Sequence, residues 1–243
     1  MTWYNRRLIL LLIILLIPAY TFSKVYLVSV GIADYPGTKN YLRLPARDAQ
    51  TITQLYNRNT GVESIQLLNQ RATVAATRAA MNRLYAVAGP NDIVVFFFSG
   101  HGYPGGFALY DGGLSYQEIR KAMARSKSRS KMVFADACFS GRIRQQQRSS
   151  QSEVNAAKRA NVMLFLSSRS NEYSLENPGM KNGFFTTYLE RGLRGGADKN
   201  RNRIITAREL FDYVHNQVVR ITDDQQHPVM WGNFPHTMTV MQW

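Results

Sequence analysis

The stretch Met132-Val-Phe-Ala-Asp-Ala-Cys-Phe-Ser-Gly141 contains the single cysteine of this 243-residue chain, Cys138. A second stretch, Ile93-Val-Val-Phe-Phe-Phe-Ser-Gly-His-Gly102, has the same form and carries a histidine, His101. Nearly continuous apolar runs are typical of strands covered on both faces, and the glycines that follow let the backbone turn sharply and approach a ligand. The two stretches therefore predict neighbouring buried strands that deliver a thiol and an imidazole to one place, as cysteine catalysis requires.

The rest of the chain alternates similar apolar runs with helical patterns. Further strands are predicted at Val25 to Val30, Ile65 to Leu68 and Val162 to Leu166. Helices are predicted around Ala49 to Tyr56, from a Thr73 cap through Ala88, after Ser115, from Phe184 to Leu193 and from Ala207 to Ile221, with a last extended segment around Val229 to Val240. This alternation predicts an α/β fold, a three-layer α/β/α sandwich with a mostly parallel central sheet. Ligands of such sheets bind beyond the carboxyl ends of the strands, where both motifs fall.

The N-terminal segment, residues 1–23, is interpreted as a signal peptide. Arg6 and Arg7 precede an apolar block from Leu8 to Ile17, and small residues near Ser23 offer a cleavage site. The block is short for a membrane span, which takes about 20 residues. We expect an exported protein, periplasmic or extracellular; the alternative is an uncleaved segment that anchors the protein.

Residues 24–243 are predicted to form one domain whose pattern of strands and helices is interrupted once. The stretch from 142 to 160 is rich in Gln, Ser and Arg and has no apolar periodicity, so it is predicted to be an exposed linker. It divides a large segment, 24–141, from a small segment, 161–243.

The formal net charge of +14 favours anionic partners, whether lipid, cell-wall polymer or nucleic acid. The alternative is an ordinary solvated basic surface. No basic stretch is interleaved with aromatic residues, so no specific nucleic-acid partner is expected.

Three further motifs point to a family. They are Arg47-Asp-Ala49, Leu109-Tyr-Asp-Gly112 and Gly183-Phe-Phe-Thr186. With the cysteine and histidine motifs, they make the chain resemble the caspase-like cysteine peptidases, specifically the bacterial relatives of metacaspases, over roughly residues 25 to 240. The resemblance implies a caspase fold and an endopeptidase that works through a Cys-His dyad.

In that mechanism Cys138 attacks the scissile carbonyl, and His101 activates the thiol and protonates the leaving amine. The backbone N–H groups of Gly102 and Cys138 are the expected oxyanion donors.

The resemblance also implies an acidic pocket that accepts Arg or Lys before the cut. The matching positions are Asp48, Ser99 and Asp136, and two carboxylates facing one pocket would attract a guanidinium. Asp111 and Glu172 are further candidates for substrate binding. Two structural alternatives stay open: that Asp48 caps a helix, and that Asp111 is a turn residue.

The linker offers arginines to an enzyme of this specificity. The resemblance implies cleavage between the large and small segments, so self-cleavage is expected near Arg144 or Arg148. The partners expected are protein or peptide substrates that carry Arg or Lys, and the enzyme is expected to be a monomer. A membrane partner is expected only if residues 1–23 stay attached.

No cofactor is required by this chemistry, but one loop has the spacing of a twelve-residue calcium site. Its oxygen ligands would be Asp198, Asn200, Asn202 and Glu209. Arg203 stands where glycine permits the sharp turn, so weak calcium binding is one hypothesis and a turn that caps the following helix is the other.

Two other classes of function remain open at this point. One is a catalytically silent caspase-like scaffold, and the other is a basic exported protein that binds an anionic surface.

Overall fold

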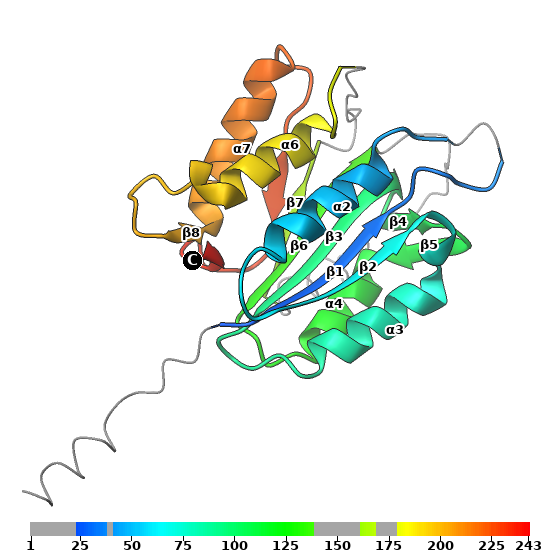
Figure 1. The fold of residues 1–243 in the computed structure, drawn as a ribbon, viewed down its shortest axis with the longest axis horizontal. Helices are drawn as coiled ribbons and strands as arrows, with labels where there is room; N and C mark the ends of the chain where they lie inside the picture. The colour runs from blue at the N-terminus through cyan, green and yellow to red at the C-terminus, as the bar shows by residue number, and fades with distance from the viewer. Residues whose placement is uncertain (1–22, 38–40, 139–160, 169–178) are drawn as a thin grey trace, which may run out of the picture.

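The computed structural model describes residues 23–37, 41–138, 161–168 and 179–243 (Figure 1). The strands in these ranges are β1 (Val25–Gly31), β2 (Val62–Leu68), β3 (Ile93–Tyr103), β4 (Gly106–Leu109), β5 (Gly112–Ser115), β6 (Ser130–Cys138), β7 (Val162–Leu166), β8 (Ile204–Thr206), β9 (Val229–Trp231) and β10 (Thr239–Gln242). The helices are α2 (Pro45–Tyr56), α3 (Val74–Tyr85), α4 (Tyr116–Ala124), α6 (Phe184–Arg191) and α7 (Ala207–Ile221), with short helical turns η2 (Asn69–Arg71) and η3 (Gly192–Gly196).

The central sheet has the order β2-β1-β3-β6-β7-β9 in the part of the chain that the structure describes. Strands β2, β1, β3, β6 and β7 are parallel, and β9 joins β7 in the antiparallel sense. Their carboxyl ends therefore meet at one edge, which positions the two motifs. Two smaller features complete the fold: β4 and β5 form a hairpin that continues from β3, and β8 pairs with β10.

Helices cover both faces of this sheet (Figure 1). Residues of α2, α6 and α7 pack on one face with Phe97, Phe134 and Phe165 of the strands. Residues of α3 and α4 pack on the other face with Phe96 and Phe98. Successive strand residues point to opposite faces, so burial of both faces requires continuous apolar runs. The predicted three-layer sandwich and its mostly parallel sheet are confirmed.

The helix starts follow local chemistry that can be read in the sequence. Thr73 accepts a hydrogen bond from the N–H of Ala76 (3.1 Å), as its predicted role as a cap requires. Ser115 and Glu118 form a reciprocal capping box at the start of α4. The hairpin of β4 and β5 was not predicted, because its apolar run is only a few residues long between glycines and its position depends on pairing with the end of β3.

Within the described residues, no helix combines the length and the apolar character needed to cross a bilayer. The predicted signal segment and the predicted linker fall almost entirely outside the described residues.

Candidate active site

The cysteine and histidine motifs lie side by side at the carboxyl edge of the sheet. Strands β3 and β6 are parallel neighbours, and their register places His101 opposite Cys138 and Ser99 opposite Asp136. Neighbouring strands are about 4.8 Å apart, so the backbone brings the two candidate catalytic residues next to each other. Gly102 follows immediately, where β3 begins to pair with Phe107 of β4.

Asp48 is a buried carboxylate close to this edge. It is only 2% exposed and accepts hydrogen bonds from three donors in two distant parts of the chain. The donors are Ser99 Oγ (2.8 Å), Asn182 Nδ2 (2.8 Å) and the Gly183 N–H (3.1 Å). Since Asp48 lies in the first turn of α2, these bonds join that helix to β3 and to the segment that begins α6.

Asp136 is the second buried carboxylate, two residues before the cysteine. Its Oδ2 accepts hydrogen bonds from the N–H (3.1 Å) and the hydroxyl (2.8 Å) of Thr186. A Cβ atom on Gly183 would lie 2.3 Å from the same oxygen. The Gly183-Phe-Phe-Thr186 motif therefore serves both carboxylates: its first N–H binds Asp48, its last residue binds Asp136, and the missing side chain makes room for Asp136.

The two carboxylates influence each other's charge. Burial, then the negative charge of Asp136, raises the pKa of Asp48 to about 7, although its hydrogen bonds with Asn182, Ser99 and Gly183 act in the opposite direction. The pair therefore holds less than its full charge near neutral pH. A cation placed beside both groups would favour their ionised forms.

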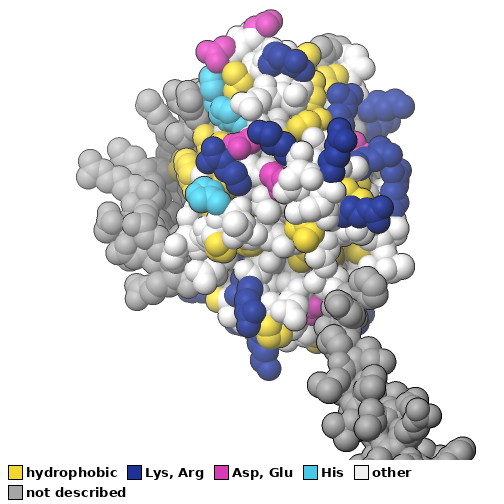
Figure 2. All heavy atoms as spheres, turned by 90° about the vertical axis from the view of Figure 1, so that its left-hand side faces the viewer, with side chains coloured by type: hydrophobic (Ala, Val, Ile, Leu, Met, Phe, Trp, Pro, Cys, Tyr) yellow, Lys and Arg dark blue, Asp and Glu magenta, His cyan; other side chains and the backbone are white. Residues whose placement is uncertain are grey.

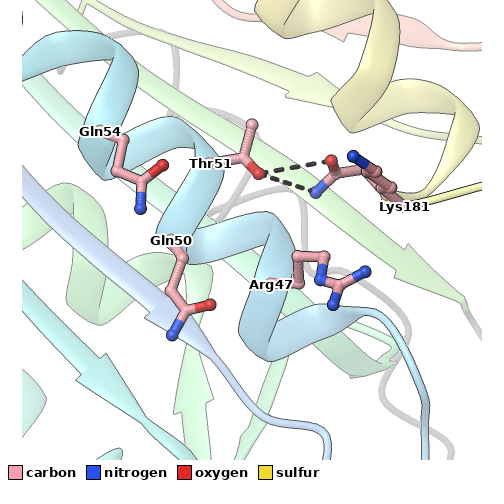
Figure 3. A pocket seen from close by; sticks show the side chains of 6 residues that line it. Arg47, Gln50, Thr51, Gln54 and Lys181 are labelled. Atoms are coloured by element: carbon pink, nitrogen blue, oxygen red, sulfur yellow. Dashed lines mark hydrogen bonds between the residues drawn. The ribbon is translucent and has the colours of Figure 1, made fainter.

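A surface cavity of about 340 Å³ lies between α2 and the segment that precedes α6 (Figure 3). Its lining residues are Arg47, Gln50, Thr51, Gln54, Lys181 and Asn182. Thr51 points toward Asn182 and is hydrogen-bonded to it, and the same Asn182 amide donates to Asp48. Arg47 is exposed at this cavity, on the outside of the helix that buries Asp48. Asn182, which no motif indicated, thus connects the outer face of α2 to the buried carboxylate.

Tyr35 is a second site residue that the sequence analysis missed. It follows β1, and its hydroxyl accepts a hydrogen bond from the backbone N–H of His101 (2.9 Å). Its ring also contacts the imidazole, with 4.7 Å between the ring centroids. An isolated tyrosine after a strand gives no signal in a single sequence, because this contact is created only when β1 and β3 pair.

The remaining candidates for substrate binding and self-cleavage are placed differently. Asp111 is exposed in the turn between β4 and β5, where its Oδ1 accepts the N–H of Val74 (2.7 Å) at the start of α3. These contacts fit the alternative given for Asp111 in the sequence analysis, a turn residue. Glu172, Arg144 and Arg148 lie outside the described residues.

The loop with calcium-site spacing binds its own backbone. Asp198 accepts the N–H groups of Asn202 (3.1 Å) and Arg203 (3.0 Å), and Asn202 accepts that of Ile204 (2.8 Å). Asn200 likewise accepts the N–H of Asn202 (3.0 Å).

The last position of that loop, Glu209, forms a capping box with Thr206 at the start of α7. The described residues contain no cluster of three or more His, Cys, Asp or Glu side chains that could hold a metal ion. The contacts are those of the capping turn, the second of the two hypotheses for this loop.

The face formed by α6, α7 and β8 is rich in cations (Figure 2). Lys and Arg side chains are spread over it with acidic side chains between them, and Arg194 and Arg208 form ion pairs with Glu190 and Asp212. The exposed cations of these elements and the loops beside them are Arg191, Arg194, Lys199, Arg201, Arg203, Arg208 and Arg220. This surface is separate in sequence from the cysteine and histidine motifs.

Comparison with known proteins agrees with the class of protein that the fold and the paired motifs define, a caspase-like α/β protein. The model of the caspase domain family of peptidases matches residues 25–238, so the chain belongs to this family. No curated protein matches the chain.

Two solved structures share the fold. Protein GSU0716 from Geobacter sulfurreducens is 19% identical with a TM-score of 0.63, and the match covers 90% of this chain and 97% of that one. Caspase-1 from Spodoptera frugiperda is 12% identical with a TM-score of 0.65, over 90% of this chain and 89% of that one.

Proposed function

We propose that this protein is a cysteine endopeptidase of the metacaspase-like type that cleaves peptide bonds after Arg or Lys. The observation that carries the proposal is the register of β3 and β6, which sets His101 opposite Cys138 with Ser99 and Asp136 two residues before them. In this proposal the catalytic pair and the specificity pocket share this edge of the sheet.

The chemistry follows the roles that these residue types can perform. The thiolate of Cys138 attacks the carbonyl carbon of the scissile bond, and the electron pair moves to the carbonyl oxygen. The N–H groups of Gly102 and Cys138 stabilise that oxyanion. As the C–N bond breaks, His101 gives a proton to the leaving amine, and water activated by the same imidazole then hydrolyses the thioester.

Two buried carboxylates support the preference for a basic side chain. Asp48 and Asp136 come from different elements and are joined by the Gly183 to Thr186 segment. A guanidinium binds carboxylates in a forked geometry and would neutralise the repulsion between them. Cleavage after aspartate would need a cation in this place, whereas Arg47 is exposed and lines the surface cavity beside α2.

A fluorogenic peptide that ends in Arg before the leaving group tests the proposal. Wild-type protein is expected to turn it over, and the variants Cys138→Ala and His101→Ala are expected to be inactive. A matched peptide that ends in Asp is expected to be a poor substrate. Equal turnover by Cys138→Ala, or no turnover of Arg, Lys or Asp peptides even after cleavage of the linker, contradicts the proposal and favours the silent scaffold.

Self-cleavage in the 142–160 linker belongs to the same proposal. Arg144 and Arg148 match the proposed specificity, so incubation of the wild-type protein is expected to give two fragments, and Cys138→Ala is expected to stay intact. The variant with Arg144→Gln and Arg148→Gln keeps the linker length and is expected to resist cleavage. Mass spectrometry of the fully active enzyme with an intact linker would count against this maturation step.

The proposed enzyme works without a cofactor, as a monomer exported from the cytoplasm. Activity is expected to survive removal of divalent ions by a chelator, because no proposed step needs a metal. Calcium dependence is the alternative, and a loss of activity on chelation that calcium restores would support it.

Binding to an anionic surface is the second candidate function, favoured by the cation-rich face of α6, α7 and β8 (Figure 2). Retention on heparin that falls steeply with salt is expected if this face is used. The inactive Cys138→Ala protein separates this function from catalysis, because it should bind heparin as the wild type does.

A further inference from the structure

The hydroxyl of Tyr35 uses both its donor and its acceptor capacity at the histidine motif. It accepts the backbone N–H of His101 (2.9 Å) and donates to the carbonyl oxygen of Ala108 in β4 (2.9 Å). Tyr35 is only 8% exposed, and burial raises the pKa of its phenol, so the group stays a neutral donor and acceptor. One side chain therefore ties the residue that carries the imidazole to the strand that follows it.

The ring of Tyr35 makes a second, independent contact with the same histidine. The two ring centroids are 4.7 Å apart and the planes are inclined by 43°. The hydroxyl thus holds the backbone of His101 while the ring lies against its side chain, so a shift of Tyr35 would move both.

The neighbouring glycine shows how closely this arrangement is packed. Gly100 has φ of +154°, and a Cβ atom there would lie 2.5 Å from the Tyr35 hydroxyl oxygen and 2.9 Å from a ring carbon of Phe98. The glycine before the histidine is therefore needed to admit the tyrosine hydroxyl. The Ser99-Gly100-His101 sequence and Tyr35 form one unit although 64 positions or more separate them.

We propose that Tyr35 is a positioning residue for His101, which fixes the strand end through the backbone N–H and sets the imidazole plane through the ring. The proposal rests on the proposed function only for its effect on activity. It also assigns the His101 N–H to Tyr35, so the oxyanion must be bound by other donors, for which Gly102 and Cys138 are the candidates.

The variant Tyr35→Phe tests the proposal because it keeps the ring and removes both hydrogen bonds of the hydroxyl. Misplaced catalytic groups cost up to about a hundredfold in rate, so we expect kcat for the Arg peptide to fall about tenfold to a hundredfold while KM changes little. A second variant, Gly100→Ala, displaces the hydroxyl from the other side and is expected to give the same pattern.

Tyr85→Phe is the matched control. Tyr85 is also buried and donates to a backbone carbonyl, that of Val95 (2.9 Å), but it lies in α3 within the core. Both Phe variants are expected to lower Tm, Tyr35→Phe by more because it loses two hydrogen bonds, and only Tyr35→Phe is expected to lower kcat. Loss of thermal stability in Tyr35→Phe with wild-type kcat would show a structural role and overturn the proposal.

Nitrogen-15 NMR of histidine-labelled protein gives a readout that does not need peptidase activity. The chain has four histidines, and His101→Gln assigns the His101 imidazole signals. We expect Tyr35→Phe to shift or broaden these signals, and Tyr85→Phe to leave them in place. Unchanged His101 signals in Tyr35→Phe contradict the positioning role even if the wild type proves to have no activity, an outcome that would reject only the proposed function.

Discussion

The edge of the sheet at His101 and the loop from Asp198 to Glu209 both carry sequence motifs with carboxylates. The two regions differ in where the hydrogen-bond donors to these carboxylates come from. At the sheet edge, Asp48 and Asp136 are buried and receive donors from distant parts of the chain. In the loop, Asp198 and Glu209 accept N–H groups no more than five residues away. Under the proposed function the carboxylates held by remote elements bind a ligand, whereas carboxylates that satisfy their own turn have a local structural role.

The largest effect is expected when a buried carboxylate is removed. Asp48→Ala should lower kcat/KM for the Arg peptide about a hundredfold, because truncating one partner of a buried charge pair with a bound guanidinium costs about 2–5 kcal/mol. The measurement is the ratio of kcat/KM for matched Arg and Asp peptides.

Asp111→Ala is the control for this change, because its carboxylate caps α3 from an exposed turn. It should cost about 1 kcal/mol of stability, as loss of a cap does, and leave the preference for Arg intact. Equal loss of preference in both variants would remove the distinction between pocket and cap.

A smaller effect is expected from crowding the pocket without changing its charge. A Cβ on Gly183 would lie 2.3 Å from Asp136 Oδ2, so Gly183→Ala must displace that carboxylate. Overpacking typically costs about 1–3 kcal/mol, and kcat/KM for the Arg peptide should fall with it, by about tenfold.

Gly112→Ala is the matched substitution, because a Cβ there meets only Val74 Cγ2 at an ordinary 3.4 Å. Chemical denaturation and kinetics of the two variants should separate clearly. If Gly183→Ala has the same stability and kinetics as Gly112→Ala, the claim that Gly183 packs closely against the Asp136 carboxylate is wrong.

The pH dependence gives a further test of the carboxylate pair. The pKa of Asp48 is raised to about 7, above the ordinary value of 3.8, so the folded protein binds this proton more tightly than the unfolded chain does. The contribution of Asp48 to the free energy of unfolding should therefore fall as pH rises from about 4 to about 7. A cationic substrate prefers the ionised pair, so KM for the Arg peptide should also fall as pH rises through 7.

Asp48→Asn separates this titration from others, since its amide stays neutral. The pH dependence of KM near 7 should be weaker in Asp48→Asn than in the wild type. An identical pH profile for the two proteins would mean that another group titrates there.

The smallest effect concerns the loop. Arg203 has φ of +64°, which disfavours side chains with a Cβ, so Arg203→Gly should stabilise the protein by up to about 1 kcal/mol. Arg208→Gly places glycine in the first turn of α7 instead, and should destabilise it by about 1 kcal/mol.

Thermal unfolding with and without calcium completes the comparison. Because the loop oxygens already bind backbone N–H groups, calcium should leave Tm of the wild type unchanged. A clear rise of Tm with calcium would show that the loop binds calcium and contradict its purely structural role.

The sequence predicts the parts of this molecule that depend on local pattern. Continuous apolar runs located the central strands, and Thr73 located the start of α3, because burial and capping act on neighbouring residues. Asn182 and Tyr35 could not be found in this way. Each acts on a residue at least 66 positions away, through contacts that exist only after the strands and helices have packed.

The central claim is that one sheet edge joins the catalytic pair to an acidic pocket, and a covalent complex tests it most directly. A crystal structure of the enzyme treated with a peptidyl-arginine chloromethyl ketone should show the inhibitor bonded to Cys138 Sγ and its guanidinium hydrogen-bonded to Asp48 and Asp136. An adduct on Cys138 whose guanidinium points to solvent, or a protein that the inhibitor does not modify at Cys138, would contradict the account.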